Sequence, residues 1–154
     1  MPTLLIVHHT PSPSLQSLLE AAVDGAGTDA IGDVEVEVRA ALTCPEVDAL
    51  QADGYLLGTT ANLGYMSGAL KHFFDRIYYP CLEETRRRPF GAYVHGNSDT
   101  AGAVRSVETA TTGLEWRRVA EVLEVVGEPA RTDLDAAWEL GATLAAAISD
   151  EVEL

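Results

Sequence analysis

The sequence predicts an α/β domain in which helices cover both faces of a parallel sheet. Apolar runs of strand length alternate along the chain with segments whose apolar residues recur at helical spacing. The first run, at residues 4–7, is apolar without interruption, as in a central strand buried on both faces. With 154 residues, the chain has the length of one domain with a sizeable core. We therefore expect residues 1–154 to form a single domain with five parallel strands in a doubly wound sheet.

The first half of the chain contains three expected strands and three expected helices. The strand at residues 4–7 is followed by a helix that Ser14 caps and that ends at residues 25–27, which include two glycines. Valine alternates with charged residues at 34–38, which is typical of a half-exposed strand near a sheet edge. A short helix at 45–51 and the third strand at 54–58 come next. Ser67 then begins a helix that Pro80 helps to end.

The second half of the chain continues the alternation. It contains a fourth strand at 90–94, a helix at 102–112, a fifth strand within 116–126 and a last helix at 133–148. The inward face expected for the last helix consists of Leu134, Trp138, Gly141, Leu144 and Ile148. Right-handed crossovers leave only a few strand orders. The common five-strand order, 2-1-3-4-5, places a ligand crevice at the carboxyl ends of the first, third and fourth strands.

The charge balance narrows the classes of function. The chain has 24 Asp and Glu against 10 Lys and Arg, a net charge of −14, which argues against a nucleic-acid partner. We interpret the only basic run, residues 86–88, as a solvated loop. Cys44 and Cys81 are far apart and form no Cys-x-x-Cys pair, as expected of reduced thiols. With no secretion signal and no apolar run of membrane-spanning length, we expect a soluble, cytoplasmic protein.

The loop after the first strand has the composition of an anion site. Thr10, Ser12 and Ser14 offer three hydroxyls, and the start of the following helix adds backbone N–H groups. No Lys or Arg precedes Arg39, and the motif GxxxxGK[ST] is absent, which argues against a nucleoside triphosphate. The loop therefore predicts a monophosphate held by neutral donors. The alternative is that these residues only cap the helix and shape the turn.

Two further loops lie at the same expected edge of the sheet. Residues 59–64 are small, and such a loop can lie against a flat ring; Gly64 permits a positive φ there. Tyr65 could stack on that ring or pack against protein. The loop at 95–99 would bound the ring from the other side. We expect no metal site, because no His, Cys, Asp and Glu cluster has ligand spacing, and no serine nucleophile elbow, because GxSxG is absent.

The third strand and the segment after it resemble a known family. The resemblance lies in a strand that ends in glycine, a Thr-containing loop, an Asn/Gly turn, Met-Ser-Gly and a helix with Phe-Asp-Arg. In this chain those residues are Gly58, Thr60, Asn62, Gly64, Met66, Ser67, Gly68, Phe74, Asp75 and Arg76. The pattern is similar to that of the flavodoxin-like FMN-binding family, which includes NAD(P)H-dependent FMN reductases and tryptophan-repressor-binding-protein-like quinone reductases. The resemblance implies a flavodoxin-like three-layer sandwich that binds FMN.

The resemblance also implies which residues hold FMN. The phosphate would be bound by Thr10, Ser12, Ser14 and the amide of Leu15. The isoalloxazine would lie against Thr60, Ala61, Asn62, Leu63, Gly64 and Tyr65, and the site would be completed by Gly96, Asn97 and Ser98. The chain departs from the family pattern in its phosphate loop, which has prolines at 11 and 13 and no arginine. It departs again at residues 95–100, which lack the aromatic ring that covers FMN in many flavodoxins.

Three functions follow from these observations. An uncovered flavin face favours an oxidoreductase that takes electrons from NAD(P)H and reduces a quinone or free flavin. The acidic surface is also compatible with a flavodoxin-type electron carrier that docks to a basic redox protein. The third alternative is a cofactor-free binding module of the same fold. An exposed patch of Tyr78, Tyr79, Pro80 and Leu82 would suit a homodimer, although burial of these residues in the core is an equal alternative.

Overall fold

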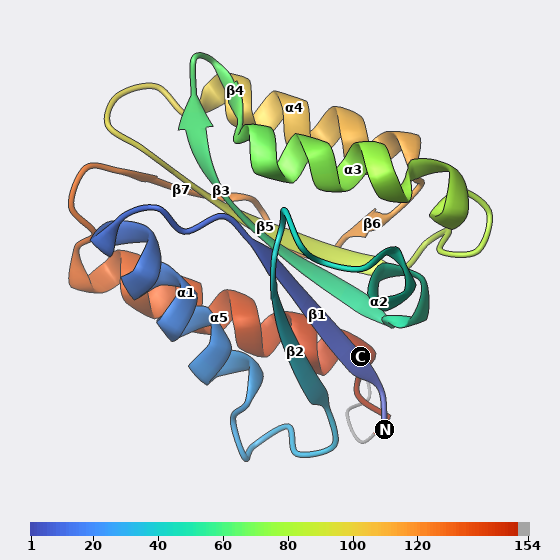
Figure 1. Ribbon diagram of the computed structural model, residues 1–154. Coiled ribbons are helices and arrows are strands. Elements are labelled where there is room, and N and C mark those ends of the chain that lie inside the picture. The colour runs from blue at the N-terminus through green and yellow to red at the C-terminus, as the bar shows by residue number, and fades with distance from the viewer. Residues whose placement is uncertain (151–154) are drawn as a thin grey trace.

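The computed structural model describes residues 1–150 and shows one twisted sheet between two layers of helices (Figure 1). The strands are β1 (Thr3–His8), β2 (Glu35–Ala40), β3 (Gly54–Asn62), β4 (Tyr65–Met66), β5 (Pro89–Gly96), β6 (Arg117–Arg118) and β7 (Leu123–Val126). The helices are α1 (Pro13–Ala26), α2 (Glu46–Gln51), α3 (Gly68–Cys81), α4 (Ala101–Gly113) and α5 (Arg131–Ile148). The main strand order is β2-β1-β3-β5-β6, with every pair along it parallel. The predicted doubly wound α/β sheet is therefore confirmed.

The predicted fifth strand is two short strands. β6 pairs with the start of β5, and β7 pairs with its end, so both occupy the fifth position in the sheet. The chain leaves the edge at residues 120–122, between the two strands. An interruption at an edge removes hydrogen bonds from one neighbour only, whereas a central strand would lose them on both sides.

The two faces of the sheet have separate cores. Leu4, Ile6 and Leu56 pack with α1 and α5, whereas Leu5, Val7 and Leu57 face α3. The uninterrupted apolar run of β1 follows from this arrangement, because successive side chains enter different cores. In the core that faces α3, the rings of Tyr55 and Trp116 stack with centroids 3.8 Å apart.

Helices α1 and α5 lie backbone to backbone. A Cβ atom at Gly141 would overlap the carbonyl group of Ala22, and a Cβ atom at Gly25 would overlap that of Trp138. The glycines therefore allow a close helix contact that alanine would block. The Trp138 side chain is 39% exposed, so its predicted inward position is wrong; its backbone, not its ring, meets α1.

Several predicted boundaries also change. The side chain that caps α1 belongs to Ser12, not Ser14, and accepts from Leu15 N at 3.3 Å. β3 continues to Asn62, so residues 59–62, predicted as a loop, belong to a strand. Ser67 does cap α3, and Pro80 lies within its last turn.

The basic run at residues 86–88 is not simply a solvated loop. Arg88 is half-buried, and its guanidinium donates to the carbonyl oxygens of Leu50 and Ala52 at 2.6 Å each. Arg86 pairs with Glu115 at 3.1 Å. Arg88 thus satisfies carbonyl groups at the end of α2, an assignment that a pattern of adjacent charges does not reveal.

Two remaining expectations concern the surface. Tyr78 and Tyr79 are 37% and 82% exposed, so burial of this pair in the core is wrong, and the homodimer stays a prediction. Within residues 1–150, none of the helices combines the length and apolar character that crossing a membrane requires.

The structure predicts that both thiols are inert in the native state. Cys44 and Cys81 are buried and free, and burial away from water raises the pKa of each to about 11. Neither thiol should react with a thiol-specific reagent at neutral pH until the protein unfolds. Because the unfolded thiols ionise first, the free energy of unfolding should fall as pH rises from about 9 to about 11. Thiol titration with and without denaturant, and urea unfolding across this range, measure both effects; rapid native labelling at neutral pH would contradict the prediction.

Candidate functional site

A cleft lies where the carboxyl ends of the central strands meet, at the left of Figure 1. Its volume is about 210 Å³, and it is an open trough rather than an enclosed cavity. It is lined by Pro11, Ser12, Ser14, Thr60, Ala61, Asn62, His95, Gly96 and Asn97. The predicted crevice thus exists, and residues from all three predicted loops contribute to it.

The first wall is the turn from β1 into α1. The Leu15 amide donates to Ser12 Oγ, and the Gln16 amide donates to the Ser12 carbonyl oxygen at 3.0 Å. Pro13 has no N–H, so the Ser14 amide is the first-turn donor left without an acceptor among residues 1–150. This wall offers an anion a helix N-terminus and hydroxyl groups, without a cationic side chain.

The second wall is the hairpin of β3 and β4. Thr59 faces α3, where its Oγ1 accepts from Ser67 N at 2.9 Å. Thr60 points to the opposite face because side chains alternate along a strand. The two-residue tip has φ values of 51° at Leu63 and 76° at Gly64. Positive values at both central residues are typical of type I′ hairpins, and they confirm the predicted conformation of Gly64.

Helix α4 fixes the position of this hairpin. A Cβ atom at Gly102 would overlap the backbone of Gly64, so the hairpin tip lies directly on the first turn of α4. Ser106 Oγ accepts from Met66 N at 3.0 Å and donates to the Ala103 carbonyl oxygen. These contacts hold the cleft wall in place without help from a ligand.

The third wall is the end of β5 and the loop after it. His95 is buried, and its Nε2 lies 2.8 Å from the Gly127 carbonyl oxygen. The Gly127 amide in turn donates to the Gly96 carbonyl oxygen at 2.9 Å. Asn97 and Ser98 are exposed beyond this anchored segment. The wall is therefore rigid at its base and open at its rim.

One polar atom in the cleft lacks a partner. Thr60 Oγ1 is buried and makes no hydrogen bond within residues 1–150, although Thr60 lines the cleft. A buried hydroxyl without a partner is costly, and such groups are rare in folded proteins. Because Thr60 lines the cleft, a rotation of its side chain would present this hydroxyl to a ligand there.

The structure does not bring every predicted site residue to the cleft. Outside its lining are Thr10, Leu15, Leu63, Gly64, Tyr65 and Ser98. The Leu15 amide is already used by the cap, and Tyr65 lies on the far side of the hairpin. Pro11 and His95 line the cleft although the predicted set omits both; the position of His95 at the end of a strand was the signal for it. No group of possible metal ligands occurs within residues 1–150.

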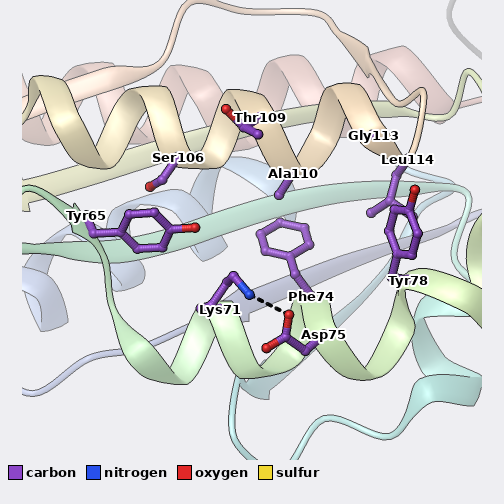
Figure 2. A pocket seen from close by; sticks show the side chains of 10 residues that line it. All are labelled: Tyr65, Lys71, Phe74, Asp75, Tyr78, Ser106, Thr109, Ala110, Gly113 and Leu114. Carbon is purple, nitrogen blue, oxygen red and sulfur yellow. Dashed lines mark hydrogen bonds and ion pairs between the residues drawn. The ribbon is translucent and has the colours of Figure 1, made fainter.

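A second hollow lies between α3 and α4, and Tyr65 of the hairpin lines one end of it (Figure 2). Its volume is about 170 Å³, and the rings of Tyr65, Phe74 and Tyr78 dominate its lining. The ion pair of Lys71 and Asp75, at 2.5 Å, lies along its rim. Tyr65 is 42% exposed and lines this hollow, so its ring does not lie in the cleft.

Comparison with solved structures identifies the architecture. A flavodoxin from the domain Archaea superimposes with a TM-score of 0.81 and 16% identity, over 95% of this chain and 98% of that one. The fold is that of the flavodoxins. The flavodoxin-like fold is shared with a flavodoxin, WrbA-like protein from Agrobacterium tumefaciens, at a TM-score of 0.75 and 17% identity, covering 94% of this chain and 96% of that chain. It is shared also with 36% of a flavodiiron protein from Giardia intestinalis, at a TM-score of 0.81 and 10% identity over 95% of this chain.

Sequence comparisons give no match to this flavodoxin-like chain, either among family models or among curated proteins. The similarity to the solved structures therefore lies in the fold, and the cleft residues must supply the argument for function.

Proposed function

We propose that the cleft binds FMN and that the protein is an NAD(P)H-dependent oxidoreductase that reduces a quinone or free flavin. The observation that carries the proposal is the unpartnered hydroxyl of Thr60, a residue that lines the same trough as the neutral helix N-terminus of α1. A monophosphate ester with a polyol chain and a flat ring would use the hydroxyls, the amides and the small residues of the trough together. The flavodoxin-like fold of the neighbours supports the same ligand.

Each wall would have its own part in binding. Ser12 and Ser14, which line the cleft, would hold the phosphate together with Thr10, which precedes the lining residue Pro11. Thr60 would donate to the phosphate or to the adjoining hydroxylated chain. Ala61 and Asn62, with the Leu63–Gly64 tip, would flank the ring, and Gly96, Asn97 and Ser98 would face it. Bound FMN would supply the redox chemistry, and the residues of the chain would bind it, orient it and keep one face accessible.

An open ring face supports a reductase. The rim at residues 97–99 carries Asn, Ser and Asp, all exposed, and no aromatic side chain. A nicotinamide or a quinone needs stacking access to a flavin, which this rim would leave free. The protein part of the catalysis would then be positioning, with no side chain acting as an acid or a base.

The alternative electron carrier rests on a different observation. The net charge of −14 suits association with a basic redox protein, which would exchange electrons without NAD(P)H. Mixing the FMN-loaded protein with NAD(P)H under anaerobic conditions separates the two functions. Rapid bleaching of the flavin absorbance supports the reductase, whereas a flavin that only chemical reductants bleach supports the carrier.

An FMN titration tests the cofactor itself. The protein should quench FMN fluorescence and should unfold at a temperature that rises with FMN concentration, because FMN binds the folded state. Riboflavin, which lacks the phosphate, should bind more weakly. If saturating FMN changes neither the fluorescence nor the unfolding temperature, the cofactor-free binding module is the correct function.

Thr60→Val should separate folding from cofactor binding. Valine keeps the shape of threonine and removes a hydroxyl that has no partner, so the free energy of unfolding without ligand should stay constant or rise by about 1 kcal/mol. FMN affinity should fall by about tenfold, the effect of one lost hydrogen bond of about 1.4 kcal/mol. Urea unfolding and fluorescence titration measure the two quantities.

Thr59→Val is the matched control for Thr60→Val. Thr59 Oγ1 donates to the Thr60 carbonyl oxygen and accepts from Ser67 N, so its loss should lower stability. If Thr60→Val lowers the free energy of unfolding as much as Thr59→Val does, the Thr60 hydroxyl has a partner in the unliganded protein, which would contradict the proposal.

A further inference from the structure

His8 lies at the carboxyl end of β1, where the chain turns into the phosphate loop. Its side chain shares the face of Ile6, toward α1 and α5, and its strand neighbours are Ala40 on β2 and Gly58 on β3. Neither neighbour has a side chain that can hydrogen-bond. His8 Nδ1 instead lies 2.7 Å from Thr10 Oγ1, and both residues are half-buried.

This hydrogen bond can run in either direction. When Nδ1 carries no proton, Thr10 must donate its only hydroxyl hydrogen to His8, and Thr10 then has nothing to donate to an anion. When Nδ1 carries a proton, His8 donates and the Thr10 hydrogen is free for another acceptor. Whether Nδ1 carries a proton, in the imidazolium or in one neutral tautomer, therefore decides whether Thr10 presents a donor or only lone pairs.

We propose that His8 is the positioning residue of the phosphate loop: it takes up a proton as a phosphate group binds and so turns the Thr10 hydroxyl into a donor for that group. The inference rests on the proposed FMN function and adds pH-dependent control of the same site. It gives this loop, which has no Lys or Arg, a positive charge that a bound phosphate stabilises.

The charges around His8 favour this coupling. Burial, and then the neighbouring His9, lower the pKa of His8, so the imidazole is neutral at neutral pH without a ligand. On β2, Arg39 pairs with Asp48 at 3.1 Å. Its register partner on β1 is Val7, which belongs to the other core, so Arg39 lies on the opposite face of the sheet from His8. α1 has no charged residue before Glu20. A phosphate dianion would thus be the charge that most favours the imidazolium.

On α5, the first turns carry Arg131, Asp133 and Asp135; Arg131 pairs with Asp135 at 3.0 Å, and Asp133 accepts from the Ala130 amide. Other titratable groups on this side lie on β5 and the loop after β7. His95 on β5 is bound to the Gly127 carbonyl oxygen, and Glu128 borders a hollow with Pro13 and Ser14. Glu128 could also attract a proton to His8, but it is present with and without ligand. The difference between the pKa of His8 with ligand and its pKa without ligand therefore reports the contribution of the phosphate alone.

Nitrogen NMR of the histidine rings tests the proposal, because it reports the protonation of Nδ1 and Nε2 separately. The protein is titrated between about pH 5 and about pH 9 alone, with FMN and with riboflavin. We expect FMN to raise the pKa of His8 and to place a proton on Nδ1, and riboflavin to do neither. In parallel, FMN affinity should fall by several-fold from about pH 6.5 to about pH 8.5, with an upper limit of roughly tenfold per pH unit for one proton.

Three variants complete the test. In His8→Asn the side-chain amide can donate to Thr10 at every pH, so FMN should bind with little dependence on pH. His9→Asn changes the adjacent histidine and should keep the pH dependence of the wild type. Thr10→Val removes the hydroxyl, and should weaken FMN binding and abolish the dependence while leaving riboflavin binding unchanged.

The outcomes distinguish this inference from the proposed function. If FMN binds and the His8 ring keeps the same pKa and proton positions, or if His8→Asn keeps the pH dependence, the inference is overturned and FMN binding stands. If FMN does not bind at any pH, the proposed function fails and the inference fails with it.

Discussion

Replacing Gly102 by alanine should move the β3–β4 hairpin and weaken the cleft. The added Cβ atom would overlap the backbone of Gly64, which cannot rotate aside as a side chain can. We expect the free energy of unfolding to fall by about 2 kcal/mol, within the range for overpacking, although alanine favours a helix more than glycine does. FMN affinity should fall by tenfold or more, roughly 1.4 kcal/mol, because the same hairpin carries Thr60, Ala61 and Asn62. Urea unfolding and FMN titration measure the two effects.

Gly68 and Gly113 are the matched controls for Gly102. A Cβ atom at Gly68 would meet no atom within 4 Å, and one at Gly113 would lie 3.5 Å from the Tyr78 ring, an ordinary contact. Both alanine variants should keep wild-type FMN affinity and stability. A Gly102→Ala protein that behaves like these two would show that the hairpin does not depend on α4.

The largest effect on folding is expected for Gly141→Ala. The new methyl group would overlap the carbonyl group of Ala22 and crowd the amide nitrogen of Ala26, so α1 and α5 would have to separate along their length. We expect a loss of about 3 kcal/mol in the free energy of unfolding, at the top of the overpacking range. The loss should exceed that of Gly102→Ala because both helices belong to one buried core. Chemical denaturation followed by circular dichroism measures it.

Gly27→Ala serves as the control for Gly141→Ala. Gly27 ends α1 with φ −91°, and the nearest atom to an added Cβ would be the Val23 carbonyl oxygen at 3.5 Å. Its stability should change by less than about 0.5 kcal/mol, as for other substitutions that create no clash. Equal losses in the two variants would argue against a special role for the α1–α5 contact.

The sequence predicts the layers of the fold well because the spacing of apolar residues along each element follows which of its side chains are buried. Residues 4–7 are apolar on both faces since helices cover both faces of β1, and the alternation at 34–38 marks β2 near the edge. The same rule fails at residues 59–62, where a strand continues with Ala61 as its only apolar residue. There the Thr59 side chain bonds to Ser67 N and Thr60 faces the cleft, so tertiary contacts rather than apolar burial stabilise the strand.

The sequence predicts where the candidate site lies, but not which side chains point into it. Hydroxyl and glycine content at the ends of three strands places the cleft correctly, because parallel strands end at the same edge. Tyr65 pairs with Asn62, which lines the cleft, yet Tyr65 lines the hollow between α3 and α4, an orientation that the sequence does not reveal. Arg88 shows the same limit, since its carbonyl partners at Leu50 and Ala52 are more than thirty residues away in the chain.

The position of the chain ends has a practical consequence. β1 begins, and α5 ends, at the edge of the sheet opposite the cleft, where Ser149 Oγ donates to Asp33 and the Thr3 amide donates to Asp53 at 2.8 Å (Figure 1). A tether attached to the start of β1 would therefore hold the molecule on a solid support with the cleft facing the solution. In that orientation, soluble donors and acceptors would reach the trough freely, while an electrode beneath the protein would be separated from it by the whole length of the sheet.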